Sequence, residues 1–236
     1  MYSEKFSAFI KMWQTAFAID KTMDEKKCVD RDGNPIPWYT YPAIEYLSQF
    51  DYSNKKVFEF GCGSSSQFWA ERAMSVVAIE DNAEWLEKWR REFEWGKLSN
   101  LEVKYRDEGE GYYRAISESG ETFDVIIIDG KLRAECARAA VACGAAGGMI
   151  ILDDSDRINT SEEYVRAVNF LRQGDYIQVD FYGFCPMNNF AKTTSVFLSR
   201  AFNFESLYKV QPIFGLGSLW GMERKDRKAF YKKFEG

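Results

Sequence analysis

Short apolar runs alternate with longer amphipathic stretches through most of the chain. Seven segments carry the apolar pattern of strands: 57–60, 76–79, 101–103, 125–128, 149–152, 176–182 and 193–198. The central runs are continuously apolar, which is typical of strands covered on both faces of a parallel sheet. The pattern therefore predicts a sheet with helices packed on both sides.

The stretches between these runs show helical spacing. A helix is expected to start near Ser64–Ser66, apolar residues recur at 85, 89 and 93, and small residues stripe 136–143. Thr160-Ser161-Glu162-Glu163 has the form of a capping box that opens a helix to about Arg172. Strands alternating with helices predict an α/β fold, a Rossmann-like doubly wound sheet. We expect this sheet to be mostly parallel, with an antiparallel C-terminal strand.

Two flanking regions lie outside this alternation. Near the N-terminus, Phe6, Phe9, Ile10, Trp13 and Phe17 lie on one helical face, and the last ~35 residues are less regular. We predict an N-terminal helical cap or lid over 1–50, a cofactor-binding catalytic domain over 51–200 and a C-terminal extension over 201–236. The aromatic face is expected to pack on the sheet domain, with a lid or a homodimer surface as alternatives. The basic residues within 224–233 predict a solvated helix face.

The composition excludes several chemistries. The 236 residues include no histidine, which rules out Ser-His-Asp and Cys-His catalysis and histidine metal ligands. Five scattered cysteines without a Cys-x-x-Cys pair indicate a reducing compartment and no zinc site. A net charge of -5 disfavours nucleic-acid and membrane-surface partners, and the N-terminus lacks a signal-peptide core. We therefore predict a cytoplasmic protein without nucleic-acid or membrane partners.

The residues that end the first two strands point to a ligand site, because open α/β sheets bind ligands at the carboxyl ends of their strands. Gly61 and Gly63 permit a tight turn, and the helix start at Ser64, Ser65 and Ser66 offers N–H groups and hydroxyls to a negative group. Glu80 ends the next strand, 19 residues after Gly61, where an acid can accept hydrogen bonds from both ribose hydroxyls. A plain turn and a helix-capping carboxylate are the simpler alternatives. Together the two features favour a nucleoside cofactor.

The residues around the turn also favour one nucleoside over another. Glu59 lies two residues before Gly61, and serine replaces the third glycine of the usual dinucleotide fingerprint, which disfavours NAD. A carboxylate there suits a ligand with a cationic ammonium, and the serine-rich helix start suits the carboxylate of the same amino acid. S-adenosylmethionine carries both groups and a ribose.

With these features the chain resembles the class I S-adenosylmethionine-dependent methyltransferases over roughly residues 35–200. More narrowly, it looks like the catechol O-methyltransferase-like small-molecule group. The matching segments are Glu59-Phe60-Gly61-Cys62-Gly63-Ser64, Glu80, Phe123-Asp124-Val125-Ile126-Ile127-Ile128-Asp129-Gly130 and Gly147-Gly148-Met149-Ile150-Ile151-Leu152-Asp153-Asp154.

The resemblance implies roles by position. Gly61, Gly63 and the backbone of Ser64, Ser65 and Ser66 would hold the methionine moiety, with Glu59 near its ammonium. Glu80 would bind the ribose, Asp107 would reach the adenine amino group, and Asp129 would face the sulfonium side.

Three carboxylates are expected to converge at the acceptor rim, the part of the strand-end edge where the acceptor should bind. Asp129 ends one central strand, and Asp153 and Asp154 end its neighbour, so that hard oxygen ligands are available for Mg²⁺ or Ca²⁺. The catechol-type family holds a metal with an aspartate from the first strand and an Asp-Asn pair from the second, whereas this chain has Asp-Asp. The alternative is that the aspartates contact the cofactor, cap the next segment or pair with arginines.

The acceptor side of the predicted site departs from the family at the position of the catalytic base. The family's lysine lies three residues after the first aspartate, but position 132 is leucine, flanked by Lys131. We expect Asp129, Lys131 or Asp153 to serve as base or metal ligand. Trp38, Tyr39, Tyr41 and the loop 183–191 are the candidate acceptor walls, with core packing as the alternative.

The expected function is in-line methyl transfer from S-adenosylmethionine to a small-molecule acceptor, with oxygen as the first guess for the acceptor atom. This chemistry needs alignment more than acid–base machinery, so the absence of histidine is no obstacle. An aminopropyl-type transferase and a non-catalytic module that binds an adenosyl cofactor are the alternatives.

Overall fold

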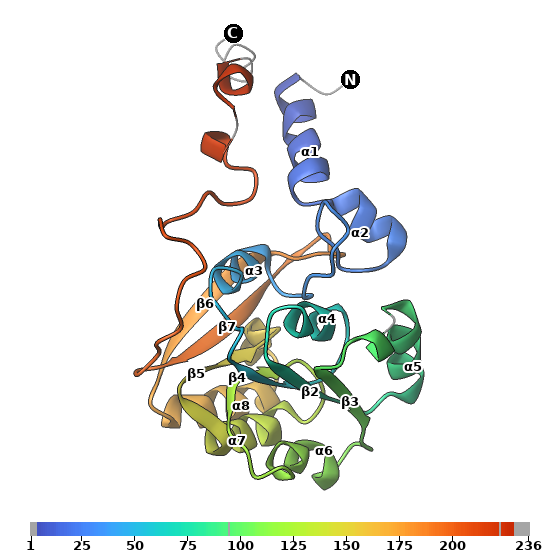
Figure 1. The fold of residues 1–236 in the computed structure, drawn as a ribbon, viewed down its shortest axis with the longest axis vertical. Coiled ribbons are helices and arrows are strands. Elements are labelled where there is room, and N and C mark those ends of the chain that lie inside the picture. Colours follow the sequence, from blue (N-terminus) through green and yellow to red (C-terminus); the bar gives the residue numbers. More distant parts are fainter. Residues whose placement is uncertain (1–3, 94, 222, 229–236) are drawn as a thin grey trace.

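The computed structural model describes residues 4–93, 95–221 and 223–228 (Figure 1). All seven predicted strands are present, as one sheet in the order β3-β2-β1-β4-β5-β7-β6. The strands are β1 (Lys56–Phe60), β2 (Ser75–Glu80), β3 (Leu101–Tyr105), β4 (Phe123–Ile128), β5 (Gly144–Leu152), β6 (Tyr176–Phe184) and β7 (Ala191–Ser199). β1 to β5 are parallel, and β7 is antiparallel to both β5 and β6. The predicted Rossmann-like sheet with an antiparallel C-terminal strand is confirmed.

Eight α-helices accompany the sheet in the described chain. They are α1 (Glu4–Ala16), α2 (Ile19–Glu25), α3 (Tyr41–Leu47), α4 (Ser64–Ala70), α5 (Ala83–Glu92), α6 (Glu110–Arg114), α7 (Arg133–Cys143) and α8 (Glu162–Gln173). Helices expected near residues 64, 85, 136 and 161 are confirmed. The helix α2 was not predicted because its only large apolar residues are Ile19 and Met23, and α6 was not predicted because its five residues are too few to show an apolar period.

The capping box predicted before α8 does not form, although the helix starts where expected. The Thr160 hydroxyl donates to the carbonyl of Arg157 at 3.3 Å, and the Glu163 carboxylate accepts from the backbone N–H of Arg133 at 2.7 Å. Ser161 is the N-cap, without a side-chain cap bond. Both predicted capping groups are therefore used in contacts outside the helix.

The core has two layers, one on each face of the sheet. Val57, Val125 and Ile127 point to the face covered by α3 and α4, whereas Phe58 and Ile126 point to the face covered by α7 and α8 (Figure 1). All five are at most 1% exposed. Burying one such side chain contributes about 1.5–3 kcal/mol, so both layers stabilise the sheet. The continuous apolar runs in the sequence follow from this burial on two sides.

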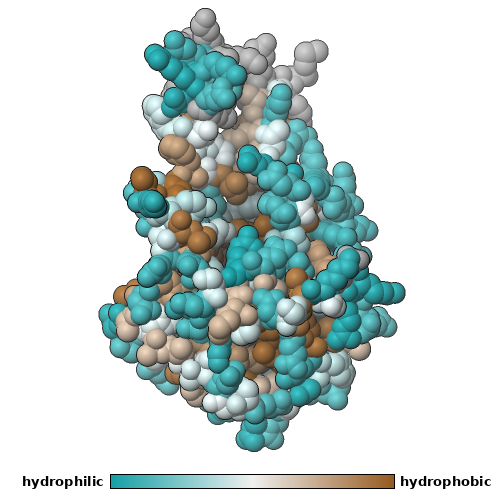
Figure 2. All heavy atoms as spheres, in the orientation of Figure 1, coloured by the Kyte–Doolittle hydropathy of each residue, from teal (hydrophilic) through white to brown (hydrophobic). Residues whose placement is uncertain are grey.

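The helix α1 and the described C-terminal segment around Gly217 lie side by side beyond the sheet (Figure 1). In α1, Trp13 stacks on Phe17 with ring centroids 4.7 Å apart and meets Phe184 of β6 edge-on at 5.1 Å. A Cβ at Gly217 of the C-terminal segment would lie 3.0 Å from the sulfur of Met12. Figure 2 shows hydrophobic residues gathered on the viewed face just below these segments.

The boundaries drawn at residues 50 and 200 stay predictions. Residues 224–228 of the basic tail are helical, whereas the remainder of that predicted helix face lies outside the described residues. All five cysteines are free. Among the described helices, none has the length and apolar character needed to cross a membrane.

Candidate functional site

The turn between β1 and α4 brings the chain close to the end of β4. Gly61 has φ 103°, a left-handed conformation that favours glycine, and a Cβ there would lie 3.1 Å from the carbonyl oxygen of Asp129. Gly63 is extended, with φ 171°, and a Cβ there would meet nothing within 4 Å. Of the two glycines predicted to permit the turn, only Gly61 is required by the backbone.

Glu59 is a buried carboxylate whose partners are hydroxyls. It is 1% exposed, and its two oxygens accept hydrogen bonds from Ser65 and, at 2.5 Å, from Ser66. No lysine or arginine in the described part of the chain forms an ion pair with it. Burial raises the pKa of Glu59 to about 8, and the charges of Asp129 and Glu80 add to that rise. A buried acid of this kind is stabilised in its ionised form by a cation brought in from the cleft.

Glu80, the last residue of β2, is held by three backbone donors. Its Oε2 accepts from the N–H of Cys62 at 3.1 Å, and its Oε1 accepts from the N–H groups of Asp81 and Asn82 at 3.0 and 2.9 Å. Burial raises its pKa. The capping role at α5 belongs to Asn82, whose side chain accepts from the N–H of Trp85 at 3.0 Å. The Glu80 carboxylate is therefore fixed at the rim of the β1 turn.

A cleft with a volume of about 1510 Å³ runs along this edge of the sheet. Most of the predicted site residues line it: Glu59, Gly61, Gly63, Ser64, Ser65, Glu80, Asp129, Lys131, Asp153 and Asp154. The fold thus brings the predicted cofactor turn and the predicted acceptor rim into one cavity.

Two predicted cofactor residues do not line the cleft. Ser66 lies behind Glu59, with its hydroxyl between that carboxylate and the N–H of Gly63, so it supports Glu59 and does not face the cavity. Asp107 is exposed and accepts a hydrogen bond from the Tyr105 hydroxyl at 2.6 Å. Its neighbour Glu108 lines the cleft instead. The loop after the edge strand β3 carries no periodic signal that would have separated these two acids.

The predicted acceptor walls divide between the cleft and the core. Trp38 lines the cleft, as do Met187, Asn188 and Phe190 from the loop before β7. Tyr39 and Tyr41 are at most 3% exposed and belong to the core, which agrees with the alternative of core packing. The Tyr41 hydroxyl donates a hydrogen bond to the carbonyl of Phe17 at 2.9 Å.

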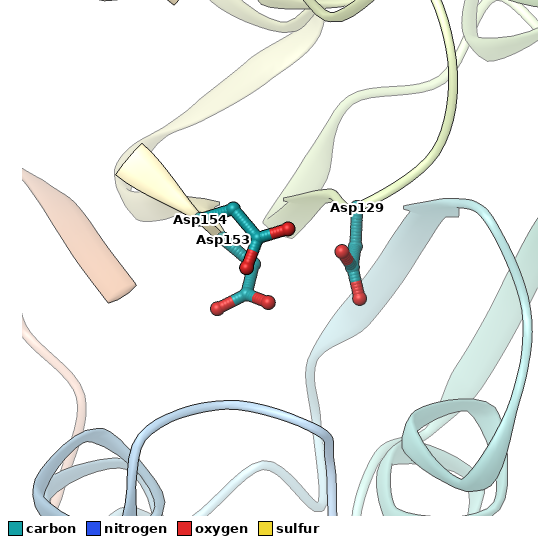
Figure 3. Close-up of side chains that lie close together, drawn as sticks. All are labelled: Asp129, Asp153 and Asp154. Atoms are coloured by element: carbon teal, nitrogen blue, oxygen red, sulfur yellow. The ribbon is translucent and has the colours of Figure 1, made fainter. Parts of the chain in front are cut away.

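The three predicted aspartates converge. One carboxylate oxygen from each of Asp129, Asp153 and Asp154 lies within 4.8 Å of the others, and Figure 3 shows the side chains pointing into a common space. Arg133, at the start of α7, contacts Asp129 at 3.1 Å and Asp154 at 3.8 Å. Burial and the Asp153 carboxylate raise the pKa of Asp129 to about 7, against the lowering effect of Arg133.

Lys192, near the start of β7, was not predicted and lies among these carboxylates. Its ammonium forms ion pairs with Asp153 and, at 2.9 Å, with Asp154. The hydroxyl of Thr194 donates to the other oxygen of Asp153 at 2.6 Å. Burial lowers the pKa of Lys192, but the carboxylates outweigh it and raise the pKa overall. Since both oxygens of Asp153 are engaged, Asp129 is better placed than Asp153 to accept a proton.

Lys131, the third predicted base, lines the cleft as an exposed residue. Its backbone carbonyl accepts a hydrogen bond from the Cys136 thiol at 3.3 Å. The geometry places it at the rim, outside the ring of paired charges around Asp153.

Comparison with known proteins gives similarity in structure only. No family profile and no curated protein matches the sequence. A protein from Klebsiella pneumoniae provisionally assigned as an O-methyltransferase has a TM-score of 0.55 at 14% identity, covering 77% of this chain and 89% of its own. The O-methyltransferase TomG from Streptomyces achromogenes, involved in tomaymycin synthesis, has a TM-score of 0.54 at 13% identity, covering 84% and 91%. Spermidine synthase from Thermotoga maritima has a TM-score of 0.50 at 18% identity, covering 63% and 54%.

These likenesses concern the fold. The sheet order, the antiparallel β7 and the helices on both faces agree with this similarity in fold. The chain therefore has a Rossmann-like fold, similar to the folds of these two O-methyltransferase structures.

Proposed function

We propose that the protein transfers the methyl group of S-adenosylmethionine to a small-molecule acceptor, with oxygen as the acceptor atom. The observation that carries the proposal is Glu59, a fully buried carboxylate in the wall of a large cleft, without a cationic partner among the described residues. An ionised acid in such a place requires a cation, and the ammonium of the cofactor's amino acid supplies one.

The geometry of the turn and of the cleft supports the remaining cofactor contacts. Ser64 and Ser65 line the cleft beside Glu59 and suit the carboxylate of the same amino acid. Glu80 is fixed by three backbone N–H groups, and its carboxylate accepts hydrogen bonds from the ribose hydroxyls. Glu108 takes the place next to the adenine that the sequence had given to Asp107.

The acceptor side then needs alignment and one proton transfer. When bound, the cofactor supplies a methyl group on a cationic sulfur that leaves as a neutral thioether. Asp129, with a pKa near neutrality, accepts the hydroxyl proton as the acceptor oxygen attacks the methyl carbon. The carbon–sulfur bond breaks as the oxygen–carbon bond forms, so no further reactant is needed. Trp38 and the loop before β7 would hold the acceptor in line.

Thermal unfolding with cofactor analogues tests the proposal. At about 100 times its Kd, a ligand adds about 2.7 kcal/mol to the stability of the protein. For a chain of this size, we expect S-adenosylhomocysteine to raise Tm by about 5–10 °C. NADH should leave Tm unchanged, and 5′-methylthioadenosine at the same concentration should raise it less, because it keeps the ribose and adenine but lacks the ammonium that Glu59 requires.

A matched pair of variants tests whether S-adenosylhomocysteine binding depends on the charge of Glu59. Glu59→Gln keeps the shape of the side chain but loses its charge, and we expect it to weaken S-adenosylhomocysteine binding by at least about 30-fold, measured by titration calorimetry. Glu102→Gln, on the exposed side of β3, should bind as the wild type does. Unchanged binding in Glu59→Gln would remove the main support for the proposal.

A further inference from the structure

We propose that Lys192 is the cation of the acceptor site, in the place that a divalent metal ion would take among Asp129, Asp153 and Asp154. The inference rests on the proposed methyl transfer and specifies how its acceptor is held. The reaction then needs no metal, and the ammonium of Lys192 positions the acceptor oxygen.

The first argument is the position of the ammonium. Lys192 contacts both neighbouring aspartates of the triad, at 2.9 Å from an oxygen of Asp154 and in an ion pair with Asp153. A Mg²⁺ ion bound by these aspartates would need the same oxygens at about 2.0–2.1 Å. The Lys192 side chain is only 9% exposed, so it is packed in this place and does not extend into solvent. The residues present therefore fit an ammonium better than a divalent ion.

The second argument is the charge balance. Three aspartates bring three negative charges, and Arg133 and Lys192 together bring two positive charges, as many as one divalent ion. Arg133 holds the Asp129 side of the cluster, at 3.1 Å, and Lys192 holds the Asp153 side. Arg133 is itself anchored to the backbone, because its Nε donates to the carbonyl of Gly130 at 2.9 Å. The two cations are thus fixed parts of the fold.

The third argument is the use of Asp153. Thr194 donates to one oxygen of Asp153 and Lys192 to the other, so this aspartate orients the lysine. An ammonium has three protons, and the two aspartates account for two of them. Lys192 also lines the cleft, so the third N–H can donate to an acceptor oxygen. Asp129 lies on the opposite side of the same space to accept the proton.

Metal titration tests the inference without any acceptor or cofactor. We expect Mg²⁺ and Ca²⁺ to leave the Tm of the wild-type protein unchanged and to give no binding heat in calorimetry. Lys192→Ala should have a lower Tm that Ca²⁺ raises, because the freed carboxylates can then bind the ion. Lys192→Arg keeps the positive charge, and its Tm should not change when Mg²⁺ or Ca²⁺ is added. Binding of either ion by the wild type with a matching loss on chelation would overturn the inference, as would a Lys192→Ala protein that ignores Ca²⁺.

Transfer of labelled methyl groups separates this inference from the proposed function. With methyl-labelled S-adenosylmethionine and a cell extract as acceptor source, we expect transfer to continue in excess chelator. It should be lost in Lys192→Met and retained in part by Lys192→Arg. Loss of transfer on chelation would refute the role of Lys192, whereas no transfer in any condition would count against the proposed function. If Lys192→Met fails to fold, the wild-type chelation and titration results still decide.

Discussion

At the scale of the residue, the protonation of the Glu59 carboxyl group is linked to cofactor binding. Its pKa of about 8 means that the carboxyl group is mostly protonated in the unliganded protein at pH 6–7. Because the folded pKa is above the ordinary value, the folded state binds the extra proton between about pH 4.5 and 8. The stability that this proton provides is lost as the pH rises through 8.

Cofactor binding should therefore release a proton. The bound ammonium favours the ionised form of Glu59, so we expect the affinity for S-adenosylhomocysteine to rise about tenfold per pH unit from pH 6 towards 8. Above that range the amino group of the ligand loses its own proton and the affinity should fall. Calorimetry in buffers of different ionisation enthalpy measures the released proton directly. Proton release of the same size in Glu59→Gln would assign the effect to another group.

At the scale of the element, the turn between β1 and α4 provides a matched pair of glycines. Alanine at Gly61 would adopt a left-handed backbone and press against the carbonyl of Asp129, whereas alanine at Gly63 would meet open space. We expect Gly61→Ala to lower the free energy of unfolding by at least about 1–3 kcal/mol. Gly63→Ala should stay within about 0.5 kcal/mol of the wild type.

Chemical denaturation of both variants checks this prediction, with S-adenosylhomocysteine binding as the second readout. Gly61→Ala should also weaken binding, because the strained turn moves the ends of β1 and β4. Equal stability of the two variants would show that the turn tolerates a side chain at either position.

The direction of each strand explains which site residues could be predicted. Glu59, Glu80, Asp129, Asp153 and Asp154 lie in or directly after apolar runs, and the runs are parallel, so their carboxyl ends share one edge. Lys192 and Thr194 belong to β7, which is antiparallel, so its start and not its end lies at that edge. A search restricted to strand ends therefore misses both.

Asp107 lies outside the cleft for a different reason. It follows β3, an edge strand whose neighbourhood is exposed, and no burial pattern marks which of the acids at 107 and 108 faces the cleft. The seven strands and the mostly parallel sheet were predictable, because burial on two faces leaves a strong pattern. Side-chain direction in an exposed loop leaves none.

At the scale of the whole molecule, Trp13 joins the N-terminal helix to the rest of the fold. It contacts Phe17, Tyr41 and Phe184, whereas Phe9, one helical turn earlier, meets Trp13 and Phe6. Among the described side chains of α1, none lines the cleft. We expect Trp13→Ala to speed hydrogen exchange of the α1 amides strongly and to leave S-adenosylhomocysteine affinity unchanged.

Phe9→Ala, at a position 49% exposed, is the matched control and should change exchange only slightly. A large loss of ligand affinity in Trp13→Ala would instead assign α1 to the cofactor site as a lid. The homodimer predicted from the aromatic face stays a prediction, and sedimentation velocity at several concentrations measures it directly.

The placement of Lys192 on β7 also has a consequence for folding. Lys192 and Thr194 are two residues apart, so they project from the same face of the strand and reach the same aspartate. The register that pairs Leu152 with Ser195 brings them there, and a slip by one residue would turn both away. Asp153 would then be a buried charge without a cation, which costs about 3–5 kcal/mol. The charge cluster thus disfavours a structure in which β7 is paired one residue out of register, and it does so through the same residues that the proposed reaction uses.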